Sequence, residues 1–422
     1  MLPDIRGAGI TDPEARLEEG RGLALAIGIV VADSFVLPIR EAKPATLFGS
    51  GQIDRIGATA AMEEAELIIV DGVLSAIQQR NLEEKLERKV IDRTGLILEI
   101  FGERAATAEG RLQVELAHLD YQAGRLVRSW THLERQRGGF GFLGGPGETQ
   151  IEADRRMIRD RMARLRRELD QVRRTRALHR ERRDRAPWPV VALVGYTNAG
   201  KSTLFNRLTG ASVMAEDLLF ATLDPTMRAI GLPGVEKAIL SDTVGFISQL
   251  PTQLVAAFRA TLEEVSEADV IVHVRDIASE AADEQKKQVE QVLAELQINT
   301  GENGDRVIPM IEAWNKWDLL DTARRAELIE IAKSQESPPV IAISAQTGEG
   351  VEQLERAIAD VLNAKAEVHR IVLPSSDGQR LAWLHAHGEV LGQEPAGQGS
   401  DGPMVEVEVR LDPREMGRFE SL

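Results

Sequence analysis

The segment VVALVGYTNAGKSTLFNRL, residues 190–208, decides the fold of this chain. Five apolar residues predict a strand, Gly195–Ser202 match the pattern G-x-x-x-x-G-K-[ST], and a helix is expected from about Thr203. Such a loop lets successive backbone N–H groups turn inward around a β-phosphate at a helix N-terminus. The lysine then neutralises the β- and γ-phosphates, and the next hydroxyl binds Mg²⁺. The predicted phosphate-binding residues are Gly195, Tyr196, Thr197, Asn198, Ala199, Gly200, Lys201 and Ser202.

A second motif specifies the base. The apolar run Val307–Ile311 is followed by N-K-x-D at residues 315–318. A carboxylate at Asp318 accepts from N1–H and N2–H₂ of guanine, whereas adenine presents an acceptor at N1, so guanine is favoured. Asn315 is expected to hold loops together, the Lys316 stem to cover the base, and the loop after the predicted strand Val340–Ile343 to offer a backbone N–H to O6. The predicted guanine-site residues are Asn315, Lys316, Trp317, Asp318, Ser344, Ala345 and Gln346.

Two further segments are expected to sense the γ-phosphate. Residues 242–245 follow the predicted strand Ala238–Leu240 and match D-x-x-G, so Asp242 is expected to hold Mg²⁺ through water and the Gly245 N–H to reach the γ-phosphate. Earlier, Thr222 could complete the Mg²⁺ shell, with Thr226 as the alternative. The nucleotide-binding residues predicted here are Phe220, Ala221, Thr222, Leu223, Asp224, Asp242, Thr243, Val244 and Gly245. The predicted metal ligands are Ser202, Thr222 and Asp242, and the predicted catalytic residues are Lys201, Thr222 and Gly245.

Phe246 bears on the rate of hydrolysis. It follows Gly245, at the position where Ras-like enzymes carry a glutamine that orients the attacking water. A phenyl ring cannot hydrogen-bond to water. Slow intrinsic hydrolysis is therefore expected, with activation by a partner that orders the switch segments or supplies the missing polar group.

The whole chain is predicted to be a multidomain α/β protein. Its 422 residues, 43% hydrophobic and 28% charged, fit two to four globular domains, and the absence of cysteine excludes disulfides and thiolate metal sites. The longest apolar run, Gly22–Ala32, is shorter than the roughly 20 residues of a membrane helix, so a cytoplasmic monomer without an integral membrane segment is expected. The predicted domains are an N-terminal α/β domain (1–106), a helical hairpin (107–186), the P-loop GTPase domain (187–365) and a small α+β C-terminal domain (366–422).

The outer domains are predicted from alternating patterns. In the N-terminal domain, strands are expected at Leu23–Val31, Leu67–Val70 and Gly95–Ile100, and helices near Ile53–Glu66 and Gln79–Lys89. Asp71 could line a pocket there, although plain turn chemistry explains it better. In the C-terminal domain, the expected elements are strands at Val368–Leu373 and Met404–Leu411 around a helix at Gln379–Leu391.

Two apolar seams predict an antiparallel helical hairpin. The first seam is formed by Leu112, Leu116, Leu119, Ala123, Leu126, Trp130 and Leu133, and the second by Ile158, Met162, Leu165, Leu169 and Val172. Between them, residues 138–147 contain six glycines together with Phe140 and Phe142. This loop is either a flexible connection or a mobile tip that inserts aromatic rings into a partner.

The charge of the chain is unevenly distributed. The net charge is −16, yet residues 155–185 carry 14 Arg against five acidic residues. A charged face is also what a solvated hairpin shows. The local excess of +9 is more than solubility requires, and arginine suits phosphate and A-form RNA, so RNA contact is favoured.

Several of these segments resemble the HflX family of GTPases. The run GPGETQIE at residues 145–152, followed by Asp154-Arg155-Arg156, is similar to a signature of that family, as are Phe220–Asp224 and the run Asp242–Ile247. The resemblance covers nearly the whole chain. It implies a GTP-hydrolysing switch that binds the large ribosomal subunit and its rRNA, rather than DNA, and that separates stalled or idle ribosomes.

Two other functions stay open at this point. One is a signalling or scaffold protein that uses GTP to present the hairpin to a protein partner. The other is a P-loop kinase for a small acceptor, which the guanine motif and the two γ-phosphate segments make less favourable.

Overall fold

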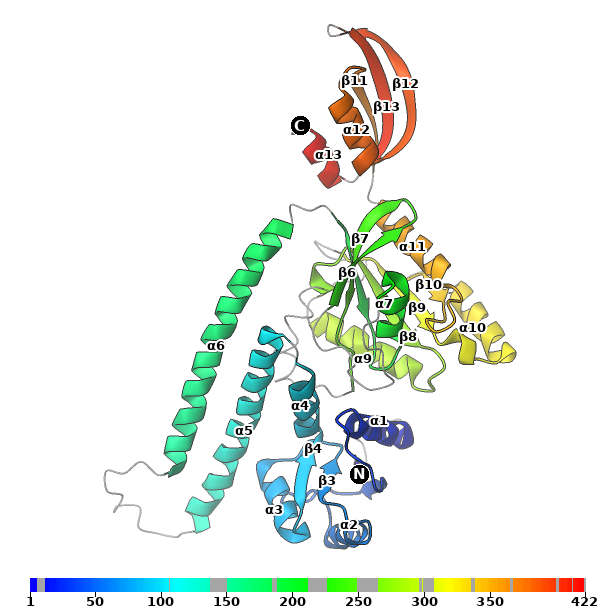
Figure 1. Cartoon of the computed structure of the whole chain (residues 1–422). Helices are drawn as coiled ribbons and strands as arrows, with labels where there is room; N and C mark the ends of the chain where they lie inside the picture. Colours follow the sequence, from blue (N-terminus) through cyan, green and yellow to red (C-terminus); the bar gives the residue numbers. More distant parts are fainter. Residues whose placement is uncertain are drawn as a thin grey trace.

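The computed structural model describes most of the chain in defined positions (Figure 1). The described residues are 1–5, 12–105, 107–136, 150–183, 188–211, 226–248, 265–295, 298, 307–334, 338–364, 367–399, 402–411 and 413–420. None of the helices in these ranges combines the length and the apolarity needed to cross a bilayer.

The N-terminal domain has two parallel two-stranded sheets connected by helices. Its strands are β1 (Leu2–Ile5), β2 (Val36–Ile39), β3 (Leu67–Val70) and β4 (Lys89–Asp92), and its helices are α1 (Pro13–Leu25), α2 (Ser50–Met62), α3 (Ala76–Leu86) and α4 (Arg93–Arg104). β1 pairs in parallel with β2, and β3 with β4. The Asp71 N–H donates to the Met1 carbonyl at 2.9 Å, which places β3 beside β1.

Two predicted strands in this domain are wrong. The run Leu23–Val31 begins within α1, which continues to Leu25, and Gly95–Ile100 lies inside α4. A short continuous apolar run does not distinguish a buried strand from a helix that is buried on most sides, and eight of the twelve residues of α4 are buried. The predicted helix Gln79–Lys89 is also too long, because α3 ends at Leu86 and Lys89 begins β4.

The two long helices form the expected antiparallel pair (Figure 1). They are α5 (Ala108–Gln136) and α6 (Gln150–Arg183), and an ion pair of 2.7 Å joins Arg161 to Glu115. The seam residues Met162, Leu165 and Leu169 of α6 are buried. α5 has a second buried face that the heptad pattern did not predict, because Val114 and Ala117 pack into the core that contains α4. The glycine-rich loop 138–147, with its two phenylalanines, lies outside the described residues.

The GTPase domain is built on a six-stranded sheet with strand order β10-β9-β8-β5-β7-β6. Its strands are β5 (Val190–Val194), β6 (Thr226–Leu232), β7 (Val235–Asp242), β8 (Val270–Asp276), β9 (Met310–Asn315) and β10 (Val340–Ala342). All neighbouring strands are parallel except β6, which is antiparallel to β7. Its helical elements are α7 (Lys201–Thr209), α9 (Ala282–Glu295), the short 3-10 helix η1 (Trp317–Leu319), α10 (Thr322–Ser334) and α11 (Val351–Asn363).

The two faces of this sheet have different neighbours. On one face, Leu193 and Val272 pack with α7 and α11 through Leu204 and Ile358. On the other face, the core that contains Val194 and α9 continues into α4 of the N-terminal domain. The N-terminal and GTPase domains therefore share one apolar core.

The C-terminal domain is a three-stranded antiparallel sheet, ordered β11-β13-β12, with two helices. Its elements are β11 (Glu367–Pro374), α12 (Gly378–His387), β12 (Glu389–Gly399), β13 (Gly402–Leu411) and α13 (Pro413–Glu420). The four alternating residues Val405, Val407, Val409 and Leu411 are buried as predicted. The predicted helix Gln379–Leu391 is too long, because a side chain at Gly388 would collide with Val409 and Leu411 and the chain turns there into β12. The domain boundaries at residues 106, 186 and 365 stay predictions.

The hairpin seam gives a test of this packing. Replacing the fully buried Leu165 with alanine should lower the stability of the paired helices by about 2–5 kcal/mol, because the cavity left between them cannot close completely. Chemical denaturation, together with hydrogen exchange of the α6 amides, measures this. The exposed neighbour Arg166→Ala is the matched control and should change stability little. Equal effects of the two substitutions would contradict the seam.

Candidate functional site

The phosphate-binding loop connects the end of β5 to the first turn of α7. Gly195 and Gly200 both have positive φ angles, +152° and +91°. A Cβ atom at Gly195 would collide with the carbonyl oxygen of Val274, and one at Gly200 would collide with the amide of Asn315. Only glycine fits at these two positions, so the loop is held tightly between β8 and the guanine motif.

The side chain of Lys201 is buried within the phosphate-binding loop. Its Nζ donates to the carbonyl oxygens of Gly195 at 3.0 Å and Tyr196 at 2.8 Å. Burial lowers the pKa of Lys201 to about 8, although nearby Asp242 acts in the opposite direction. A phosphate oxygen that replaces these carbonyls would supply the full counter-charge that the buried ammonium lacks.

Two of the predicted Mg²⁺ ligands meet beside the lysine. The Ser202 hydroxyl donates to Asp242 Oδ2 at 2.8 Å, and Asp242 is fully buried at the end of β7. In the same loop, the Thr197 hydroxyl is buried and has no hydrogen-bond partner in the described structure. Hydroxyl and carboxylate oxygens are ligands that suit Mg²⁺, so these residues fit the ion together with a phosphate group. The third predicted ligand is Thr222, and it lies outside the described residues with Phe220, Ala221, Leu223 and Asp224. Its alternative, Thr226, begins β6 opposite Asp242.

The D-x-x-G segment lies directly on the phosphate loop. The Thr197 N–H donates to the Phe246 carbonyl at 2.7 Å, and the Phe246 N–H donates to the Gly195 carbonyl at 3.1 Å. A Cβ atom on Gly245 would lie 3.1 Å from Lys201 Nζ. Gly245 is thus beside the lysine expected to meet the γ-phosphate. The ring of Phe246 is buried in the shared apolar core and offers no polar group to a water molecule.

The guanine motif is connected to the phosphate loop through Asn315. Its Nδ2 donates to the Ala199 carbonyl at 2.7 Å, and its Oδ1 accepts from the Ala345 N–H at 2.8 Å. This matches the predicted role of Asn315 in holding loops together. The same contact means that the Ala345 N–H, one of the backbone donors of Ser344-Ala345 considered for guanine O6, is engaged by Asn315 in this structure. Asp318 follows in η1 and is half-buried.

Two residues that the motifs did not indicate support this site. Arg207, in the last turn of α7, donates through Nε to the Ala345 carbonyl at 2.6 Å and also contacts the Gln346 carbonyl. Asp276, at the end of β8, forms an ion pair of 2.8 Å with Lys316. Neither belongs to a motif, and the only signal in the sequence was their position at the end of a predicted helix or strand. Both hold the guanine loops in place.

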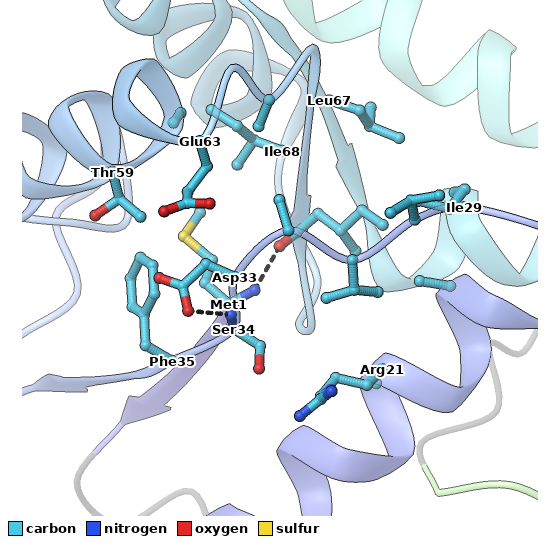
Figure 2. Close-up of a pocket in the computed structure, with 18 of the residues that line it drawn as sticks. Met1, Arg21, Ile29, Asp33, Ser34, Phe35, Thr59, Glu63, Leu67 and Ile68 are labelled. Atoms are coloured by element: carbon cyan, nitrogen blue, oxygen red, sulfur yellow. Dashed lines mark hydrogen bonds between the residues drawn. The ribbon is translucent and has the colours of Figure 1, made fainter.

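A separate cavity of about 500 Å³ lies in the N-terminal domain (Figure 2). Its lining is mostly apolar and includes Thr59 from α2, Glu63 just after α2, Arg21 from α1, and Phe35 just before β2. None of the predicted nucleotide-binding residues that have described positions lines it. Asp71 does, but its carboxylate binds Arg16 and Arg93, so it is not a simple turn residue.

Comparisons with known proteins cover almost the whole chain. Family models match as GTP-binding GTPase N-terminal (residues 14–102), GTP-binding GTPase Middle Region (104–183), 50S ribosome-binding GTPase (190–316) and HflX C-terminal domain (329–421). A GTPase HflX of Magnetococcus marinus is 49% identical over 96% of this chain and 90% of that protein. A GTPase HflX of Escherichia coli is 44% identical over 86% of this chain and 83% of that protein. A solved GTP-binding protein of Sulfolobus solfataricus in complex with GDP is 24% identical, with a TM-score of 0.46, over 86% of this chain and 98% of that one.

The lowered pKa of Lys201 predicts how nucleotide affinity depends on pH. Without nucleotide the ammonium is half neutral near pH 8, and a bound phosphate restores its charge, so binding takes up a proton above that pH. The Kd for GTP should therefore rise roughly twofold at pH 8 and fourfold at pH 8.5, relative to pH 7. Calorimetry in buffers of different ionisation enthalpy measures both the affinity and the proton uptake. Lys201→Arg keeps a permanent charge and should show no such step, so an identical pH profile in this variant would exclude Lys201 as the titrating group.

Asp318 gives a test of base recognition. Asp318→Asn replaces an acceptor with an amide that can donate, which suits the C2 carbonyl of xanthine rather than the N2 amine of guanine. We expect the preference to move from GTP to XTP by at least 100-fold, since a site built on hydrogen bonds to the base discriminates strongly. Competition binding with both nucleotides measures the change. Asp321→Asn, on the exposed surface nearby, is the control. A variant that still prefers GTP would show that Asp318 does not read the base.

Proposed function

This chain belongs to the HflX family of GTPases, and from that premise we propose that it is a Mg²⁺-dependent GTP hydrolase that acts as a conformational switch on the large ribosomal subunit. In this role it separates stalled or idle ribosomes and works as a cytoplasmic monomer. The observation that carries the proposal is the meeting of Lys201, Ser202 and Asp242 around one buried point, next to a guanine motif fixed by Asn315. The match of residues 190–316 to a 50S ribosome-binding GTPase model supports the ribosome as the partner.

Different residues of the site would bind the phosphates, the base and Mg²⁺. The loop amides and Lys201 would bind and orient the phosphates, while Asp318 reads the base. Ser202 and Asp242, with Thr222 as a further ligand, would hold Mg²⁺, which supplies positive charge where negative charge develops on the phosphates. Gly245 would donate its N–H to the γ-phosphate, which requires it to move from its present place against the loop. Such a rearrangement is the ordinary order–disorder switch of GTPases.

The buried ring of Phe246 supports slow hydrolysis by the protein alone. Because residue 246 cannot orient water, a partner has to order the switch segments or supply the missing polar group. A group supplied in this way typically raises the rate of a GTPase by about 10³–10⁵.

The basic helix α6 supports RNA as the part of the ribosomal subunit that this protein contacts. Arg159, Arg167 and Arg174 are exposed on one side of the helix, away from the seam that α6 buries against α5. RNA duplexes are recognised through backbone and shape, for which guanidinium groups are well suited. DNA is not expected as a partner.

The salt dependence of GTP turnover separates this proposal from a scaffold that binds a protein. GTP hydrolysis is measured with and without purified large ribosomal subunits between 50 and 200 mM salt. We expect strong stimulation at low salt that weakens by roughly 10- to 50-fold, because about three phosphate contacts release their counterions.

Charge reversal identifies the surface responsible. The triple variant Arg159→Glu, Arg167→Glu and Arg174→Glu should lose most of the stimulation and keep its basal turnover. The matched control reverses three exposed basic residues of α10 and α11, namely Arg324, Lys333 and Arg356. Stimulation that is equal in both triple variants, or that does not depend on salt, would favour a protein partner instead.

A further inference from the structure

A cluster of buried polar side chains joins the N-terminal domain to the phosphate site. We call it the Arg93 cluster, and its members are Glu19, Asp71, Arg93, Tyr196 and Ser248. The first three come from the N-terminal domain. Tyr196 belongs to the phosphate loop, and Ser248 lies three residues after Gly245. Nothing in the nucleotide motifs predicts this connection.

Arg93 is the centre of the cluster and is only 1% exposed. Its Nη1 donates to Asp71 Oδ1 at 2.6 Å. Its Nη2 donates to Glu19 and, at 3.1 Å each, to the carbonyl and hydroxyl oxygens of Ser248. Burial alone would lower the pKa of Arg93. The carboxylates of Asp71 and Glu19 raise the pKa by more than burial lowers it, so the guanidinium is permanently charged. Removing one member of such a buried set leaves charges without partners, which is strongly destabilising.

Glu19 and Tyr196 complete the connection to the phosphate loop. The Tyr196 hydroxyl donates to Glu19 at 3.0 Å and accepts from the Ser248 N–H at 2.6 Å. The Ser248 hydroxyl also donates to Glu19, at 2.9 Å. Burial raises the pKa of Tyr196, so its hydroxyl stays protonated and can serve both contacts. Both the main chain and the side chain of Ser248 are therefore hydrogen-bonded to members of the Arg93 cluster.

The contacts of Ser248 affect the segment that is expected to meet the γ-phosphate. Gly245 and Phe246 lie on the phosphate loop through two backbone hydrogen bonds, and Gly245 adjoins Lys201. A γ-phosphate bound at Lys201 would have to share this space with Gly245, because a Cβ atom on Gly245 would lie only 3.1 Å from Nζ. A diphosphate lacks the group that comes to the D-x-x-G segment. Since Ser248 is only two residues beyond Phe246, its anchor restricts displacement of this segment.

We propose that the Arg93 cluster sets the discrimination between GTP and GDP. Glu19 and Arg93 act as positioning residues that hold Ser248 and Tyr196 in the arrangement without a γ-phosphate. Part of the binding free energy of the γ-phosphate is then used to loosen the contact between the two domains. The inference rests on the nucleotide site of the proposed function and does not depend on the ribosome.

The test compares two nucleotides on the full-length chain. Calorimetry gives the Kd for GDP and for GMPPNP, a GTP analogue that is not hydrolysed. Tyr196→Phe removes one oxygen and keeps the ring, and Ser248→Ala removes one hydroxyl. Each should lower the Kd for GMPPNP relative to the Kd for GDP by about threefold to tenfold. This is the effect expected when one or two hydrogen bonds that favour the arrangement without a γ-phosphate are lost. Glu19→Gln, which keeps the shape of the side chain, should have a smaller effect than Glu19→Ala.

The control is a variant that weakens the N-terminal domain without touching the cluster. Arg88 serves this purpose, because it binds main-chain carbonyls of its own domain, including that of Ala65 at 2.7 Å. Arg88→Gln should leave the ratio of the two affinities unchanged. An unchanged ratio in folded Tyr196→Phe and Ser248→Ala, a shift towards GDP, or a parallel loss of both affinities would each overturn the proposal. Failure of ribosome binding would leave this result unaffected, so the two proposals can be judged separately.

Discussion

The arrangement of domains depends on two neighbouring side chains at the junction of β4 and α4. Asp92 accepts from the Tyr121 hydroxyl at 2.6 Å and from Arg125 at 2.8 Å, which holds the hairpin helix α5. Arg93, the next residue, binds Ser248 of the GTPase domain. Both are only 1% exposed. Two successive residues thus connect the hairpin and the nucleotide site to the same small sheet.

Apolar side chains pack around these polar contacts and add to the surface that is buried between the two domains. Leu96 and Phe101 of α4 lie in one core with Val194, Phe246 and Ile247. Burying apolar surface favours association without selecting an orientation, whereas a buried charge with fixed partners penalises every other arrangement. Phe246 belongs to this core, so the residue after Gly245 packs against the N-terminal domain and offers no polar group to a water molecule. The slow hydrolysis that we propose and the contact between the two domains would then have the same structural cause.

The sequence predicted some elements well and others poorly, for identifiable reasons. The strand Val190–Val194 was predicted with its observed bounds, because a motif on one side and Pro189 on the other limit it. The run Gly95–Ile100 was assigned to a strand and is helical, since most of α4 is buried and Glu99 is the one charged residue within that run. The strand β12 was missed because glycine, proline and charged residues dilute its pattern. The predicted ligand Thr222 and the glycine-rich loop stay predictions.

The sequence by itself determined the nucleotide chemistry. Residues 195–202 are contiguous, and the spacing of glycine, lysine and serine follows from the local geometry that a phosphate demands. Asn315 and Asp318 could likewise be assigned because they share one short motif. The tertiary structure alone decided that Arg93 meets Ser248, 155 residues further along the chain. Local patterns record which side of an element is buried, but not which distant group it meets. That choice is made when separate elements fold onto one core and every buried charge has to find a partner.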